Sequence, residues 1–342
     1  MRSGSIILAQ PFHFEAGGVI EDLEIAFHTS DRDYVPGEPV VWVCHALTAN
    51  SDPTDWWPGM VGKGKTLDPD KYYIVCANML GSPYGSSSPA KVNPSTGKPW
   101  MLDFPRVTVR DIVRANIEVR KHLGIDRIDL IIGSSIGGFQ AMEWAIMEPR
   151  TILKAVFMAT SERVPAYLTA YEETQRMALE ADESFRRAES LEGGKAGLEC
   201  ARAIALISYR SYEGYKRTQS EPDSDTLFAG RACSYQQHQG KKLSARFDAY
   251  CYYTLSLSLD SHNVGRGRGG VPAALQRISA ETLCIGIGGD CIFPAEEIRR
   301  MSALIPGARY GQIESAFGHD GFLLENEQIT NLITPLLPPC KC

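Results

Sequence analysis

Short runs of almost uninterrupted hydrophobic residues recur along the chain from residue 40 onward. Such runs are typical of strands buried on both faces of a parallel sheet. They cover residues 40–44, 72–77, 128–132, 153–158 and 282–287, and a later strand is predicted at 310–314. Between them, residues 107–122 and 136–147 carry hydrophobic positions at helical spacing, and Pro149 ends the second helix. The pattern predicts an α/β protein with a mostly parallel central sheet and helices on both faces.

The regular alternation of strands and helices is interrupted between about residues 161 and 276. Amphipathic helical patterns dominate there, at 171–181, 195–209 and 247–259. We therefore predict a core of residues 1–160 and 277–342, into which residues 161–276 are inserted as a helical lid. Near the N-terminus, residues 11–15 and 23–28 alternate around a glycine pair, which predicts an entry hairpin.

Composition narrows the compartment and the partners. The 342 residues are 44% hydrophobic, which allows a sizeable core, and no stretch has the length of a membrane span. The net charge of −6, without a long run of one sign, disfavours nucleic acid and anionic membranes as partners. The basic glycine cluster at 265–270 could suggest RNA, but its isolation favours a structured loop.

The N-terminus lacks the hydrophobic region of a signal peptide. The nine cysteines are scattered, several inside hydrophobic runs, which is typical of a reducing compartment. We expect a cytoplasmic protein. The close pair Cys340 and Cys342 lacks the spacing of a zinc or redox site, so no metal is expected.

The strongest chemical signal is Gly133-Ser134-Ser135-Ile136-Gly137, which follows a hydrophobic run and opens a helix. In such a G-x-S-x-G turn the central serine is exposed at the helix N-terminus, and small neighbours prevent clashes. Ser134 is the competing hydroxyl, but only Ser135 has glycines two positions away on both sides. The sequence therefore predicts Ser135 as a nucleophile rather than as part of a simple connecting turn.

Two backbone amides are expected to stabilise the oxyanion that forms during attack by Ser135. The free amide of Ile136 lies at the positive end of the helix. The second amide should come from the loop after the run at 40–44, where we choose Leu47. His45 in this loop could serve as a base, but its position favours a role in shaping the loop through hydrogen bonds.

A G-x-S-x-G turn between a buried strand and a helix, within an α/β pattern, predicts the α/β-hydrolase fold. That fold orders its triad as serine, acid and histidine, so the general base should follow the nucleophile along the chain. Of the seven histidines, only His262 and His319 lie in loop-like segments well after Ser135. His319 alone follows a late strand, so we predict it as the base.

The acid should end the preceding strand. Asp290 follows the run at 282–287 through a glycine turn and lies 29 residues before His319, which leaves room for one helix and one strand. Glu314 and Asp320 are lesser candidates. In the predicted triad, His319 takes the serine proton, and Asp290 orients the imidazole, which leads to a covalent acyl-enzyme.

Further motifs follow one another along the chain: His45-Ala46-Leu47-Thr48, Cys76-Ala77-Asn78-Met79-Leu80-Gly81-Ser82, Asn93-Pro94-Ser95-Thr96-Gly97-Lys98-Pro99, Asp103-Phe104-Pro105, Gln140-Ala141-Met142-Glu143-Trp144, Ile207-Ser208-Tyr209-Arg210-Ser211, Val264-Gly265-Arg266-Gly267 and Gly318-His319-Asp320. Through them and the serine turn, the chain resembles the homoserine O-acetyltransferase family of methionine biosynthesis over roughly residues 11–325.

The resemblance implies a ping-pong reaction in which Ser135 accepts an acetyl group from acetyl-CoA and passes it to the hydroxyl of L-homoserine, activated by His319. It further implies that Arg210 holds the substrate carboxylate and Asp320 the ammonium, which suits their charges. It suggests a homodimer formed through lid helices. Acetyl-CoA is expected as a co-substrate, with no bound cofactor.

Some positions depart from the usual family pattern. Ser134 and Ile136 stand where glycine and methionine are common, Gly288 and Gly289 precede Asp290 where an acidic residue is common, and Asn263 replaces a frequent aspartate. None of these belongs to the triad. Succinyl-CoA as donor and L-serine as acceptor stay open, as does an esterase that uses water. A non-catalytic binding protein is disfavoured by the intact triad.

Overall fold

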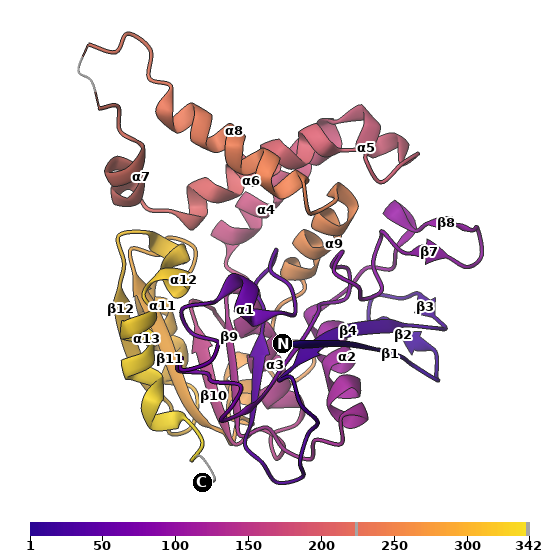
Figure 1. Ribbon diagram of the computed structural model, residues 1–342, viewed down its shortest axis with the longest axis vertical. Coiled ribbons are helices and arrows are strands. Elements are labelled where there is room, and N and C mark those ends of the chain that lie inside the picture. Colours follow the sequence, from indigo (N-terminus) through magenta and orange to yellow (C-terminus); the bar gives the residue numbers. More distant parts are fainter. Residues whose placement is uncertain (223–224, 340–342) are drawn as a thin grey trace.

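The computed structural model describes residues 1–222 and 225–339 and is built around one eight-stranded sheet (Figure 1). The strands run in the order β1-β4-β6-β5-β9-β10-β11-β12. The neighbours β1, β4 and β6 pair antiparallel, and all pairs from β6 to β12 are parallel. The strands of this sheet are β1 (Arg2–Ile7), β4 (Glu24–Thr29), β5 (Val40–Cys44), β6 (Tyr73–Ala77), β9 (Leu130–Ser134), β10 (Lys154–Met158), β11 (Glu281–Gly288) and β12 (Arg309–Glu314).

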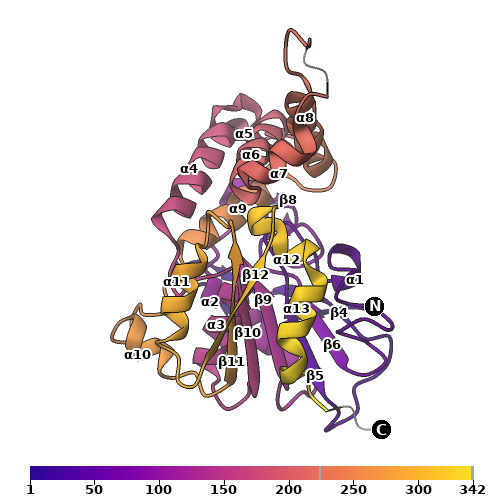
Figure 2. The ribbon, with the colours of Figure 1, turned by 90° about the vertical axis from the view of Figure 1, so that its left-hand side faces the viewer.

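Helices cover both faces of the sheet because successive residues of its central strands point to opposite sides. On β5, Trp42 belongs to one buried hydrophobic cluster, and Val41 and Val43 belong to the other. Figure 2 shows α11 and α13 on opposite sides of the strands. The helices of this part are α1 (Pro53–Trp56), α2 (Val109–His122), α3 (Ile136–Met147), α10 (Val271–Leu275), α11 (Ala295–Ser302), α12 (Gly321–Leu324) and α13 (Asn326–Ile333). The predicted α/β-hydrolase architecture is confirmed.

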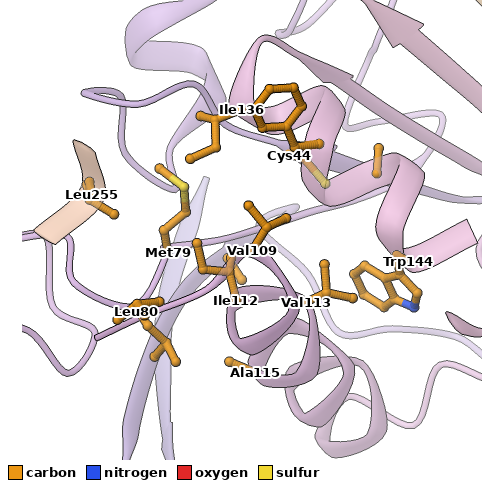
Figure 3. Close-up of a cluster of buried hydrophobic side chains, with 14 of the residues drawn as sticks. Cys44, Met79, Leu80, Val109, Ile112, Val113, Ala115, Ile136, Trp144 and Leu255 are labelled. Carbon is orange, nitrogen blue, oxygen red and sulfur yellow. The ribbon is translucent and has the colours of Figure 1, made fainter. Parts of the chain in front are cut away.

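The start of α3 is fixed by hydrophobic packing. Figure 3 shows Val113 of α2 facing Trp144 of α3, with Ile136 and Cys44 in the same cluster. Ile136, Val113 and Trp144 are fully buried. A buried side chain directly after Ser135 anchors the first turn of the helix, so the serine itself is held at a defined place.

Between β10 and α10 the chain forms helices that lie at one end of the sheet (Figure 1). The three helical patterns expected here fall in α4, α6 and α9, whereas α5, α7 and α8 were not predicted. The domain boundaries drawn at 160/161 and 276/277 stay a prediction. The helices are α4 (Ala166–Ala181), α5 (Glu183–Arg187), α6 (Lys195–Tyr209), α7 (Tyr212–Gln219), α8 (Arg231–Ser244) and α9 (Ala249–Asp260).

The N-terminal hairpin is smaller than predicted. Strand β2 (Phe12–His13) pairs with β3 (Val19–Ile20) around Gly17 and Gly18, whose φ angles of 96° and 93° suit glycine. The prediction that residues 23–28 form the second arm is wrong. Residues 24–28 lie in β4, which pairs with β1 and β6 instead. A second small hairpin joins β7 (Val92–Asn93) to β8 (Lys98–Pro99).

The basic glycine cluster is a structured loop held by ion pairs. Arg266 donates two hydrogen bonds to Glu15, at 2.7 and 2.9 Å. Arg268 and Arg110 both bind Glu143 of α3, whose side chain is almost fully buried. The loop therefore ties the N-terminal hairpin and α2 to the helix that follows Ser135.

The described cysteines are all free. Cys340 and Cys342 lie outside the described residues. None of the described helices is both long enough and apolar enough to cross a membrane.

Candidate active site

The backbone at Ser135 adopts the strained turn that the sequence predicts. Its φ and ψ are 58° and −128°, and its amide is held by the carbonyls of Met158 and Ala159, each at 3.1 Å. A Cβ added at Gly133 would collide with the backbone of Gly137. No other residue type fits such positions, so the glycines are a requirement of the turn that presents Ser135.

His319 and Asp290 form a buried hydrogen-bonded pair. Nδ1 of His319 donates to Oδ2 of Asp290 at 2.7 Å. The other oxygen, Oδ1, accepts from the amides of Ile292 and Phe293 at 2.8 and 3.1 Å, which fixes the carboxylate. Burial alone lowers the pKa of His319, but the charge and hydrogen bond of Asp290 outweigh it and raise the pKa above its usual value. With Nδ1 committed to Asp290, Nε2 is left to act as the base.

A pocket of about 180 Å³ brings Ser135 and His319 together. Asp290 lies behind the imidazole, so the structure places the three predicted triad residues in one constellation. The pocket is closed by residues from the loop after β5, from α6, from the loop between α8 and α9, and from α12. Its lining comprises Ala46, Leu47, Thr48, Ala49, Trp56, Ser135, Arg202, Tyr209, Arg246, His319, Asp320, Phe322 and Leu323.

The two amides chosen for the oxyanion both lack a hydrogen-bond acceptor among the described residues. Ile136 begins α3, and Leu47 lines the pocket. His45 holds this loop: Nδ1 donates to the carbonyl of Ala46 at 2.9 Å, and Nε2 accepts from the amide of Met79 at 3.1 Å. Burial lowers the pKa of His45 to about 4. A neutral imidazole with both nitrogens occupied shapes the loop and is not placed to act as a base.

His262, the other late histidine, is buried away from the pocket. Its Nε2 bonds to the carbonyl of Ser161 at 2.8 Å, and its ring stacks on Phe139 at 3.8 Å between centroids. It does not line the pocket.

Arg210 and Asp320, the two residues expected to bind substrate, are not placed alike. Asp320 lines the pocket, whereas Arg210 is not among the lining residues. Arg210 ends α6 in an extended conformation, and its Nε donates to Oδ2 of Asp320 at 3.1 Å. Burial raises the pKa of Asp320, and Arg210 and His319 oppose the shift. Arg210 is therefore placed to hold Asp320 rather than to reach into the pocket.

Arg202 is the residue that the sequence analysis missed. It lines the pocket from α6, and its guanidinium lies 5.5 Å from the ring centre of Tyr209. It makes no hydrogen bond or ion pair within the described part of the chain. The spacing of seven residues between Arg202 and Tyr209 puts both on one face of α6, which could have signalled the site.

Among the described residues, no cluster of three or more histidine, cysteine, aspartate or glutamate side chains could hold a metal ion. The serine, histidine and aspartate described above are arranged as covalent acyl chemistry requires.

Comparison with known proteins identifies the relatives of this chain. A family model described as the alpha/beta hydrolase fold matches residues 39–326. A homoserine O-acetyltransferase from Cyclobacterium marinum is 41% identical, covering 93% of this chain and 90% of that protein. The structure of homoserine O-acetyltransferase from Staphylococcus aureus is 31% identical with a TM-score of 0.80, covering 99% and 95% of the two chains. The structure of an acetylester hydrolase from Corynebacterium glutamicum is 25% identical with a TM-score of 0.85, covering 98% and 95%. The chain is thus an acyltransferase enzyme of the α/β-hydrolase fold that belongs to the homoserine O-acetyltransferase family.

Proposed function

We propose that this enzyme transfers an acetyl group from acetyl-CoA to the hydroxyl of L-homoserine, in two steps through an acyl-enzyme on Ser135. The product, O-acetyl-L-homoserine, would enter methionine biosynthesis. We further propose a division into a core (residues 1–160 and 277–342) and a lid (161–276), and a cytoplasmic homodimer.

In the first step, Oγ of Ser135 attacks the thioester carbonyl while His319 takes the serine proton. The oxyanion is stabilised by the amides of Leu47 and Ile136. The C–S bond then breaks, and the CoA thiolate receives the proton from His319. In the second step, the homoserine hydroxyl gives its proton to His319 and attacks the serine ester. Ser135 leaves with that proton, so an ester and a thiol have formed from a thioester and an alcohol. Throughout, Asp290 stabilises the protonated imidazole.

The observation that carries the acceptor is the pair of opposite charges in the pocket. Arg202 presents a guanidinium that has no ion-pair partner among the described residues, and Asp320 presents a carboxylate beside the base. An amino acid has the complementary pair, a carboxylate and an ammonium. We propose that Arg202 binds the substrate carboxylate and Asp320 the ammonium, while Arg210 orients Asp320. Fixing both ends of a small substrate aligns its hydroxyl with the acyl-enzyme.

A second candidate function is hydrolysis of acetyl esters, which the likeness to the acetylester hydrolase supports. Both functions use the same acyl-enzyme and differ in whether water or an amino acid discharges it. The charged pocket favours the transferase, because an ester hydrolase that uses water has no need for an ammonium-binding carboxylate.

Intact-protein mass spectrometry separates these functions. The enzyme is mixed with acetyl-CoA or succinyl-CoA, and L-homoserine, L-serine or buffer is then added. We expect a one-acetyl adduct that is absent in Ser135→Ala and that homoserine discharges at least about tenfold faster than buffer. Discharge at the same rate in buffer, with acetate as product, would support the hydrolase. An adduct only from succinyl-CoA, or discharge only by serine, would change the substrate and keep the mechanism.

A further inference from the structure

A second cavity adjoins the reaction pocket, and the two share Arg246. The second cavity has a volume of about 210 Å³ and lies between the start of α6 and the segment that joins α8 to α9. Its lining comprises Pro83, Leu191, Glu192, Gly193, Lys195, Leu198, Ser244, Ala245, Arg246, Phe247, Asp248 and Ala249. Arg246 therefore lies at the boundary between the two spaces.

The reaction pocket cannot contain a whole CoA thioester. Its volume is about 180 Å³, whereas pockets that enclose drug-sized ligands measure roughly 300–1,000 Å³. In a two-step reaction the acceptor occupies the same pocket after the donor has left. The nucleotide end of the donor must therefore lie outside it, and the second cavity adjoins the pocket at Arg246.

The charges of the second cavity suit an anion. Nη1 of Arg246 donates to the carbonyl of Thr48 at 2.7 Å and to the hydroxyl of Tyr84. Its Nε and Nη2 have no partner among the described residues, which leaves one side of a planar guanidinium for a phosphate. Lys195 is exposed at the first position of α6 and likewise lacks an ion-pair partner in the described chain.

Two carboxylates also line this cavity and must be weighed against the cations. Asp248 caps α9, accepting from the amide of Cys251 at 2.8 Å. Burial raises the pKa of Asp248, and its hydrogen bonds oppose the shift. Its charge is therefore engaged at the helix start. Glu192 is exposed and can turn toward solvent.

A larger hollow near the ends of β11 and β12 also has basic residues, Lys216 and Arg217, together with Glu213 and Glu314. It shares no lining residue with the reaction pocket. A donor bound at Ser135 would therefore not extend from the reaction pocket into this hollow.

We propose that the cavity beyond Arg246 binds the nucleotide phosphates of the acyl donor, with Arg246 and Lys195 as their contacts. The proposal rests on the proposed function, because it requires a CoA thioester to acylate Ser135. It also gives Arg246 a second task. Through Thr48, this residue connects the donor site to the loop that carries the oxyanion amide of Leu47.

The test compares two donors with the same thioester. Acetyl-CoA carries the phosphates, and S-acetyl-N-acetylcysteamine lacks them. We expect Lys195→Gln and Arg246→Gln to raise KM for acetyl-CoA by about fivefold and about tenfold. The short thioester should react with Lys195→Gln as with the wild type. Arg246→Gln should slow the reaction of the short thioester less than that of acetyl-CoA, because the short thioester is affected only by the loss of the contact between Arg246 and Thr48.

Lys242→Gln is the matched control, since Lys242 is exposed on α8 and lines neither cavity. Adenosine 3′,5′-bisphosphate provides a second measurement: it should inhibit the reaction with acetyl-CoA, and less strongly in Lys195→Gln. If both variants lose the two donors' activities in equal proportion, or if Lys195→Gln behaves like the control, the phosphate site is refuted.

Failure of the proposed function can be distinguished from failure of the phosphate site, because the first is measured on the wild-type enzyme alone. If neither acetyl-CoA nor succinyl-CoA acylates Ser135 while the short thioester does, CoA is not the donor, and both proposals fall. If only succinyl-CoA acylates it, the phosphate site stands, since the two donors share the same nucleotide, and the variants are measured with that donor.

Discussion

Replacing Arg202 with glutamine should damage the second half-reaction and spare the first. The guanidinium is half-buried in the pocket and forms no ion pair with any residue that the structure describes, so we assign to it the carboxylate of the acceptor. A hydrogen bond to a charged group contributes about 1.5–3 kcal/mol, which partial exposure reduces. With tenfold per 1.4 kcal/mol, we expect kcat/KM for homoserine to fall about 10- to 50-fold. Acylation of Ser135 should change less than about threefold, because the donor has no carboxylate at this position.

Rapid-mix mass spectrometry can follow the two half-reactions separately. Acylation is measured with acetyl-CoA alone, and discharge is measured by adding homoserine to the isolated acyl-enzyme. Arg210→Gln is the matched comparison, since it removes the same group from the end of the same helix. We expect a smaller loss of discharge from Arg210→Gln, because Asp320 keeps its place in the pocket and loses only its 3.1 Å contact with Nε.

L-Homoserine amide sharpens the measurement, since it keeps the ammonium and the acceptor hydroxyl and lacks the carboxylate. An acceptor without a carboxylate should show almost no difference between the wild type and Arg202→Gln. The reasoning would be refuted if Arg202→Gln slowed acylation and discharge equally, or if Arg210→Gln lost more homoserine-dependent discharge than Arg202→Gln.

Three other changes have expected outcomes. Asp290→Asn should lower kcat by about 10³–10⁴-fold. In the wild type, kcat/KM falls as pH drops through the raised pKa of His319, since the base must be neutral. In the variant this limb of the pH profile should move to lower pH, because the charge of Asp290 is lost while burial still lowers the pKa and only the smaller contribution of Asp320 raises it. Gly133→Ala should lower the free energy of unfolding by about 2–3 kcal/mol in a urea titration, since its Cβ meets backbone that cannot retreat; Gly230→Ala, which has open space, should cost less than about 1 kcal/mol. Glu172 is buried, and burial raises its pKa to about 7. The folded state therefore binds a proton more tightly than the unfolded state, and the free energy of unfolding falls as pH rises from 4.5 through about 7. Glu172→Gln should remove this fall, which amounts to up to roughly 3 kcal/mol, and an equal fall in the two proteins would contradict the prediction.

The buried parallel strands and α3 could be predicted because their patterns are local. A strand covered on both faces is hydrophobic at every position, as β5 is, and it can be recognised without knowledge of its neighbours. Strand β1 escaped prediction because it lies at the sheet edge, where most of its residues are exposed. Alternation likewise marks β4 as a strand but does not say with which strand it pairs, which is why the hairpin was drawn wrongly.

The helices between β10 and β11 show the same limit of local pattern. Helix α6 has a hydrophobic side that packs against α4, and it matches the predicted range of 195–209. Helix α8 buries only Gly240 and Leu243, so its sequence has too few hydrophobic positions to stand out. Its place depends on contact with α6, which no short window of sequence contains.

The site residues likewise divide into those that a local pattern predicts and those that depend on the surrounding structure. Ser135 and its glycines are set by one local turn, whereas the choice between Arg202 and Arg210 depends on where α6 ends. Arg202 lies inside the helix, two turns before Tyr209 and on the same face, so its side chain follows the helix surface into the pocket. At Arg210 the backbone turns to φ −113° and ψ 151°, and its side chain leaves in another direction, toward Asp320. The two arginines are only eight residues apart along the chain. Because the backbone changes conformation between them, one lines the pocket and the other supports Asp320.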